Sequence, residues 1–128
     1  MAGTVGVKVE GAANLKRTLL AAGLSLEDLK ATNQRVEERL VPLMVAAAPR
    51  GKTGNLIRSI RGSGTKDAAV SRSGSKAVPY ARPIHWGWAA RHIRPQRFMW
   101  DVIQNYRELW EAMYENECER VLDRVKGV

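Results

Sequence analysis

Several features that small proteins often rely on are scarce in this chain of 128 residues. Its single cysteine, Cys118, excludes an intramolecular disulfide and any metal site built from several thiolates. No run of about eighteen apolar residues occurs, and the N-terminus lacks a basic-then-apolar export signal. We therefore expect no membrane association, and a protein that is made and kept in a reducing, cytoplasm-like compartment.

Acidic residues are almost missing from the middle of the chain. Residues 49–97 contain eleven Lys/Arg and a single acid, Asp67, which gives this segment a charge of +10. Residues 1–48 add +1 from six basic and five acidic residues, and residues 98–128 add −3 from four basic and seven acidic ones. Basic charge attracts polyanions or acidic protein surfaces. The asymmetry therefore predicts an electrostatic partner for the middle of the chain.

The order of expected strands and helices, together with the resemblance described below, predicts one α+β domain over residues 1–128. We expect a small, mostly antiparallel sheet, a bipartite N-terminal helical segment and a long C-terminal helix. Val5, Val7 and Val9 alternate with small or charged residues, which is typical of a strand with one buried face. Apolar stripes at helical spacing, with glycine and proline at their ends, predict the helices. The expected elements are a strand at 4–10, helices at 12–22 and 26–47, a hairpin or loop region at 55–88, and a helix at 96–125.

Glycine, serine and basic residues dominate residues 61–77. Small polar side chains bury little apolar surface, so we expect this segment to be mobile in the isolated subunit. A hairpin around Ala68 to Ser71 fits the turn-forming residues. The following residues, Tyr80 to Trp88, predict a further strand, which Pro83 would place at an edge or a bulge.

Patterns that resemble catalytic or nucleotide-binding sites are incomplete. The Gly-Lys-Thr at 51–53 lacks the earlier glycine of a P-loop, because Ala46 stands in its place. His85 and His92 are the only histidines, and residues 68–99 contain no Asp, Glu or Cys to complete a metal or acid–base site. A small metal-dependent nuclease would therefore need acids from elsewhere in the chain. We expect no enzymatic activity, no cofactor and no metal, and a partly exposed structural role for the histidines.

Tryptophan and arginine gather in the second half of the basic segment. Trp86 and Trp88 flank Gly87 and would share one face of an extended segment. Such tryptophans stack on nucleic-acid bases, anchor protein interfaces or pack in the core. No nucleic-acid-binding motif accompanies the charge, which favours packing in the core or at an interface. The candidate interface residues are Arg50, Lys52, Tyr80, Arg82, Trp86, Trp88, Arg91, Arg94 and Arg97, with Glu111 and Glu115 on the acidic last helix.

An ordered series of short motifs spans nearly the whole chain. The valine-rich strand and a glycine-led helix with Leu15 are followed by Pro49, Thr53-Gly54-x-Leu56-x-x-Ser59-Ile60, a basic variable loop, Tyr80-Ala81, an apolar stretch ending in Gly87, and Pro95-x-x-Phe98 at the start of a long helix. In this order the chain resembles the head–tail joining (neck or tail-completion) proteins of long-tailed bacteriophages. One departure is His85-Trp86-Gly87, where such proteins often carry Glu-Phe-Gly.

The resemblance implies a small structural subunit of the virion neck that performs no catalysis and assembles in the host cytoplasm. It implies a six- or twelve-fold ring of copies that joins the capsid connector to the tail, with connector and tail proteins as neighbours and passing DNA as a further partner. A closed ring needs unlike patches on one subunit, and the basic middle and the acidic last helix provide such a pair. A basic nucleic-acid-binding module is the alternative, and its affinity would fall steeply with salt.

Overall fold

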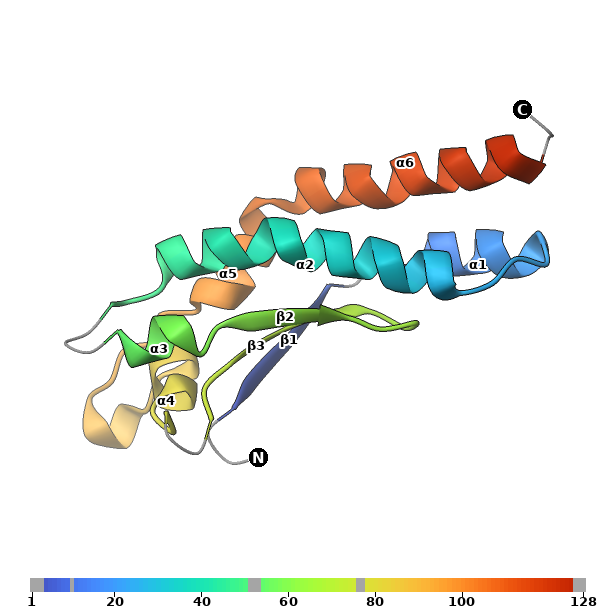
Figure 1. Cartoon of the computed structure of the whole chain (residues 1–128). Coiled ribbons are helices and arrows are strands. Elements are labelled where there is room, and N and C mark those ends of the chain that lie inside the picture. Colours follow the sequence, from blue (N-terminus) through green and yellow to red (C-terminus); the bar gives the residue numbers. More distant parts are fainter. Residues whose placement is uncertain (1–3, 10, 51–53, 76–77, 126–128) are drawn as a thin grey trace.

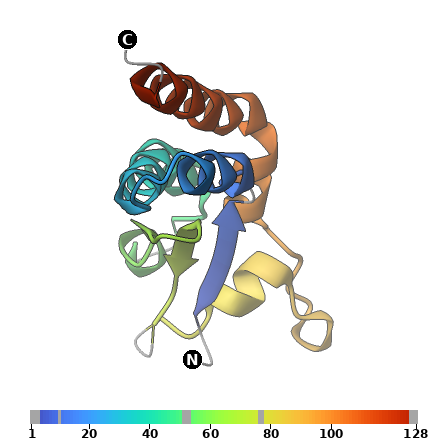
Figure 2. The same ribbon diagram turned by 90° about the vertical axis from the view of Figure 1, so that its right-hand side faces the viewer.

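The computed structural model describes residues 4–9, 11–50, 54–75 and 78–125. They form an α+β fold in which helices are layered on one face of a three-stranded antiparallel sheet (Figure 1, Figure 2). The predicted fold class is thereby confirmed. The strands are β1 (Val5–Val9), β2 (Arg61–Gly64) and β3 (Ala69–Ser73), in the order β1-β3-β2. The helices are α1 (Ala13–Ala21), α2 (Glu27–Ala47), α3 (Asn55–Arg58), α4 (Ala81–Trp86), the 3-10 turn η1 (Ala89–Arg91), α5 (Phe98–Asn105) and α6 (Arg107–Val125). Within the described ranges, no helix has the length and apolar character needed to cross a lipid bilayer.

One face of the sheet supplies the floor of the core. The three valines of β1 are buried and alternate with exposed Gly6 and Lys8, as their spacing predicts. Their register partners on the central strand, Ala69, Ser71 and Ser73, are buried as well. In Figure 1, α2 lies along this face and α6 lies on the far side of α2. The core between these layers includes Leu15, Leu19, Leu29, Val36, Leu40, Met44, Met99, Val102 and Ile103.

Residues 61–77, which we expected to be mobile, contain two of the three strands. The turn of their hairpin lies at Thr65–Ala68, where the Thr65 N–H donates to the Ala68 carbonyl at 3.0 Å, slightly before the predicted position. The second strand, β3, is central and pairs with both neighbours. The structure thus places part of the segment that we expected to be mobile in two paired strands, while residues 76 and 77 lie outside the described part of the chain.

Close packing explains why this hairpin is rich in small residues. A Cβ atom on Gly64 would lie 2.3 Å from the backbone nitrogen of Gln34, and one on Gly62 would lie 2.4 Å from Oε1 of Glu37. Both distances are far below van der Waals contact, so β2 approaches α2 at a separation that only glycine permits. The Gly64 N–H also donates to the Gln34 side-chain oxygen at 2.9 Å. The glycines are thus requirements of the helix–sheet interface.

A buried polar side chain ties α2 to both the hairpin and α6. Asn33 is 0% exposed, and its Nδ2 donates to the Thr65 carbonyl at 2.7 Å. Its Oδ1 accepts a hydrogen bond from the Tyr114 hydroxyl. Burial, with a smaller contribution from Glu37, raises the pKa of Tyr114, so the hydroxyl keeps its proton and remains a donor. Buried polar groups of this kind are retained only when they are hydrogen-bonded.

The strand predicted for Tyr80 to Trp88 is wrong, because α4 occupies most of it. Pro83 stands in the first turn of α4, where a missing backbone N–H costs no intrahelical hydrogen bond. The helix ends at Gly87, which has φ +83° and donates its N–H to the Pro83 carbonyl at 2.7 Å. A Cβ on Gly87 would lie 2.9 Å from Cδ of Pro95, so the turn requires glycine for both its angle and its space.

The helix predicted at 96–125 is divided into α5 and α6, with a break at Tyr106. The indole N–H of Trp110 donates to the Ile103 carbonyl at 2.8 Å and satisfies this group at the break. A side chain therefore replaces a helical backbone donor here. The predicted helices at 12–22 and 26–47 correspond to α1 and α2.

Candidate functional site

Residues 79–97 form a projection that we call the aromatic–basic lobe. It comprises α4, η1 and an isolated antiparallel bridge between Trp88 and Ile93, whose backbone N–H groups donate to each other's carbonyls at 2.9 and 3.0 Å. His92, within this loop, has a φ of 56° in the left-handed region. The lobe lies at the lower edge of the molecule in Figure 1 and Figure 2, away from α6 at the top.

Large aromatic side chains on the lobe are turned toward solvent. Tyr80 is 40% exposed, Trp86 46% and Trp88 47%. The guanidinium carbon of Arg91 lies 5.3 Å from the centroid of the Trp88 ring, a cation–π contact. These aromatic side chains are thus available to a partner, and the predicted alternative of core packing for Trp86 and Trp88 is wrong.

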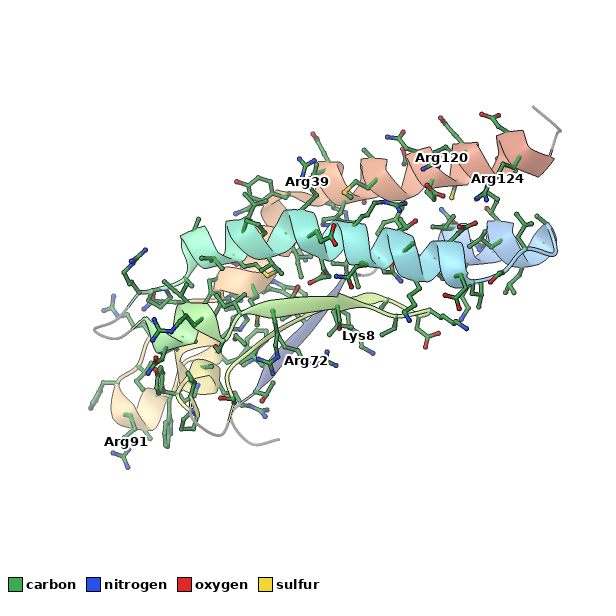
Figure 3. All side chains as sticks on the ribbon, viewed as in Figure 1. Lys8, Arg39, Arg72, Arg91, Arg120 and Arg124 are labelled. Carbon is green, nitrogen blue, oxygen red and sulfur yellow. The ribbon has the colours of Figure 1, made fainter. Side chains whose placement is uncertain are left out.

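No ion pair among the described residues neutralises the positive charge of the lobe. Its four arginines, Arg82, Arg91, Arg94 and Arg97, are exposed, and residues 79–97 include no acid. The ion pairs formed among the described residues involve other side chains. Figure 3 shows Arg91 extending from the end of the lobe into solvent. Such a surface attracts an acidic partner.

An apolar groove of about 480 Å³ lies on the lobe between α4 and the bridge. It is lined by Pro79, Tyr80, Pro83, Ile84, Trp88, Arg91 and Ile93. The lobe therefore combines apolar area with positive charge, which is the combination found at the centre of protein interfaces.

His85 anchors the lobe from beneath. In contrast to the partly exposed position that we predicted, it is 0% exposed. Its Nε2 accepts a hydrogen bond from the Trp100 N–H at 3.3 Å, and its ring meets those of Phe98 and Trp86 edge-on at 5.1 and 4.2 Å. Burial lowers the pKa of His85 to about 4, although the nearby Asp101 opposes this shift. The imidazole is therefore neutral at physiological pH and works as a structural acceptor.

The other reactive side chains do not converge on one place. His92 is exposed on the lobe, whereas Cys118 is half-buried on α6, where burial raises the pKa of its thiol. In the part of the chain that the structure describes, no group of three or more His, Cys, Asp or Glu is arranged to hold a metal ion. Residues 51–53, with the Gly-Lys-Thr sequence, lie outside the described residues.

The acidic candidates lie beside a second hollow, which we call the α1/α6 groove. It has a volume of about 580 Å³ and is lined by Gly11, Ala13, Asn14, Thr18, Trp110, Glu111, Tyr114, Glu115, Cys118 and Glu119. Gly11 lets the backbone approach the two aromatic rings beneath the groove, because a Cβ at this position would lie 2.7 Å from the Trp110 ring and 2.9 Å from Tyr114. The chain before α1 therefore packs directly on two aromatic rings of α6.

Glutamates at successive turns of α6 form the rim of this groove. Glu111 pairs with Arg107 at 2.7 Å. Glu115 and Glu119 are exposed, and neither forms an ion pair with another described residue. The groove is thus negatively charged at its rim and aromatic at its floor.

The structure separates the predicted basic segment into different surfaces. Arg50 is exposed just after the end of α2, and Lys52 lies outside the described residues. Lys66 pairs with Glu27 at 3.1 Å, away from the lobe. Seven of the predicted interface residues, Tyr80, Arg82, Trp86, Trp88, Arg91, Arg94 and Arg97, are brought together on the lobe.

Sequence reasoning missed a buried carboxyl group, Glu37, at the contact between α2 and the sheet. It is 1% exposed, and its Oε1 accepts a hydrogen bond from the Ser71 hydroxyl at 2.6 Å. Burial raises the pKa of Glu37 to about 7, and the Ser71 hydrogen bond opposes this shift. The sequence feature that could have indicated this burial is the position of Glu37 on the apolar stripe of α2, one residue after Val36 and one turn before Leu40.

Comparison with known proteins gives no family for this chain, so its surfaces are the basis for the function proposed below. No protein-family model matches the chain, and neither does any curated protein or solved structure.

Proposed function

We propose that this chain is a structural subunit of the neck of a long-tailed bacteriophage, present as copies in a ring that joins the capsid connector to the tail. The aromatic–basic lobe carries this proposal. Its three aromatic side chains are 40–47% exposed beside four arginines that form no ion pair with other described residues. Trp, Tyr and Arg are the residues that dominate the energetics of protein interfaces.

Other observations support an assembly role. The order of sequence motifs resembles the head–tail joining proteins, and the α+β fold agrees with what that resemblance implies. The buried, neutral His85 serves as a hydrogen-bond acceptor for the backbone of α5, a structural task. We therefore expect the chain to act by binding other proteins in the virion, without catalysing a reaction.

Disruption of the gene in a phage that encodes this chain tests the proposal. Electron microscopy should show filled heads and finished tails that remain unjoined, and a plasmid copy of the wild-type gene should restore joined particles. A Trp86→Ala/Trp88→Ala copy should fail to restore them, because the lobe would lose its apolar anchors. Leu20→Ala is the matched control, since Leu20 is an exposed apolar residue, at 57%, on α1 and far from the lobe. A normal yield of joined particles after disruption would contradict the proposal.

One observation favours a nucleic-acid-binding module as a second candidate. Arg61 and Arg72 are directly opposite in the β2–β3 register, and Gly6, the partner of Arg72 on β1, precedes Lys8 by two residues. Figure 3 shows Lys8 and Arg72 on the face of the sheet turned away from α2. Like charges directly opposite each other are unfavourable, and a phosphate would relieve this.

Duplex DNA binding measured at two salt concentrations distinguishes the two candidates. Phosphate contacts predict affinity that falls steeply between about 50 and 200 mM salt. An Arg61→Gln/Arg72→Gln variant should then bind more weakly and with a smaller salt dependence. Tight binding that is lost in this variant, combined with normal particles after gene disruption, would favour the module over the neck subunit.

A further inference from the structure

We propose that the aromatic–basic lobe of one copy docks in the α1/α6 groove of the next copy, so that subunits associate head to tail. This inference rests on the proposed function and deepens it, because it names the two surfaces that meet within the ring.

The chemistry of the two surfaces is complementary. The lobe carries four exposed arginines and no acid, whereas the rim of the α1/α6 groove carries Glu111, Glu115 and Glu119. Two of these glutamates, Glu115 and Glu119, form no ion pair with another described residue. Exposed ion pairs add little affinity but select partner and register. The charges therefore determine which surfaces meet.

The exposed aromatic side chains of the lobe provide the affinity. Trp86 and Trp88 are nearly half exposed on the lobe, whereas the Trp110 and Tyr114 rings beneath the groove are only 3% exposed and belong to the core of their own chain. The groove, at about 580 Å³, offers room for large side chains from a partner. Exposed tryptophans beside arginines, as Trp88 lies beside Arg91, are the side chains that contribute most to protein interfaces.

The two surfaces lie at opposite ends of the molecule. Figure 1 and Figure 2 both place the lobe at the bottom and α6 at the top, with α2 between them. The lobe is therefore remote from the groove of its own chain and meets that surface only on another copy. A contact between unlike patches leads to a ring or a filament when it is heterologous, whereas a two-fold dimer would exchange the contact reciprocally between two copies and end there.

The single cysteine allows a direct test. Cys118 lines the groove, so one cysteine added at exposed Ala90 on the lobe reports the contact between copies. With a short bismaleimide, Ala90→Cys should give a ladder of dimers, trimers and larger species on denaturing gels. The wild type and an Ala90→Cys/Cys118→Ser variant should give no ladder. The reaction is carried out on the purified chain at high concentration and on isolated particles.

Outcomes of the cross-linking separate this inference from the proposed function. Dimers that form equally well without Cys118 would show a lobe-to-lobe contact and overturn the inference. Failure to form a ladder in isolated particles would also overturn it. If gene disruption still separates heads from tails in either case, the proposed function stands and only the assigned contact is wrong.

Charge reversal provides a second, independent test. An Arg91→Glu/Arg94→Glu chain and a Glu115→Lys/Glu119→Lys chain should each remain monomeric in sedimentation velocity, at a concentration where the wild type associates. Mixed in equal amounts they should associate again, because each reversed surface then faces one of opposite charge. Thermal unfolding of each variant alone checks its fold, since all four side chains are exposed.

The two charge-reversed chains also show whether the lobe binds a different protein. If the groove variant associates like the wild type while the lobe variant fails to join heads to tails, the lobe binds an acidic neighbouring protein and the inference is wrong. If the mixture associates no better than either variant alone, the two surfaces do not meet.

Discussion

The free energy of unfolding should depend on pH through two buried groups whose effects have opposite sign. Glu37 is 1% exposed, and burial raises the pKa of its carboxyl group from 4.5 to about 7, against the effect of the Ser71 hydrogen bond. Between these values the folded state holds the proton and the unfolded state has released it. Stability from this group is fully present below pH 4.5 and is lost as the pH rises through 7. Since one pKa unit corresponds to about 1.4 kcal/mol, the loss amounts to about 3 kcal/mol.

His85 acts in the reverse direction. Burial lowers its pKa from 6.5 to about 4, so between these values the folded state is neutral and the unfolded state is protonated. Stability from this group is fully present above pH 6.5 and is lost as the pH falls through 4. The loss is at most about 3 kcal/mol. Between about pH 4.5 and 6.5 the two effects oppose each other, so the wild type should change little in stability.

Single substitutions should reveal the two opposed slopes. Glu37→Gln keeps an acceptor for the Ser71 hydroxyl and cannot ionise, so stability should rise with pH over this window. His85→Gln keeps an acceptor for the Trp100 N–H, so stability should fall with pH. At pH 8, Glu37→Gln should exceed the wild type by about 1–3 kcal/mol, because the amide left without a partner offsets part of the gain.

Urea denaturation followed by tryptophan fluorescence at pH 4.5, 5.5, 6.5 and 8 measures these slopes. The double variant Glu37→Gln/His85→Gln is the control, because its residual pH dependence belongs to all other groups. An identical pH dependence in the wild type and in Glu37→Gln would refute the reasoning, since it would mean that the carboxyl group of Glu37 does not retain its proton when buried.

Two predictions concern the packing of the sheet and of α6. Gly64→Ala should destabilise the fold by about 1–3 kcal/mol, because the added methyl group would meet the backbone of α2. Gly6→Ala is the control, with no atom within 4 Å of the new methyl group, and an equal loss in both variants by thermal unfolding would contradict this packing. Tyr114→Phe should cost about 1–3 kcal/mol in urea denaturation, because the buried Asn33 oxygen loses its donor. Tyr106→Phe, at a tyrosine that is 42% exposed, should cost far less, and a similar cost would show that the buried bond contributes nothing.

Elements whose pattern is set by their own periodicity were predicted well from the sequence. The alternating valines of β1 and the apolar stripe of α2 each have one buried face, and the spacing alone shows which. A hairpin was predicted around Ala68 to Ser71, but the two paired strands at 61–73 were not. Its glycines are needed because α2 approaches the backbone of β2, and this approach is a tertiary contact between distant segments. A glycine that permits close packing and one that permits disorder look alike in a sequence.

The candidate site shows a similar division. Composition was enough to single out the tryptophans and arginines of the lobe, because exposed Trp beside Arg is a feature of interfaces. Composition did not predict the backbone conformation of the lobe. Pro83 favoured an edge strand or a bulge in the sequence, whereas in the structure it lies in the first turn of α4. The burial of Glu37 was not predicted from the sequence either. Charged residues are almost never fully buried unless they are paired. The partner of Glu37, Ser71, lies on a strand that the sequence did not predict.

His85 links the stability of the fold to the charge of the lobe. In the sequence pattern that this chain resembles, an acid often precedes the residue before the glycine, and here that position holds a buried histidine. The imidazole supports α4 through the Trp100 N–H and the Phe98 ring while carrying no charge at neutral pH. A neutral histidine adds no negative charge beneath the four arginines, which suits the docking that we propose against the glutamates of the α1/α6 groove.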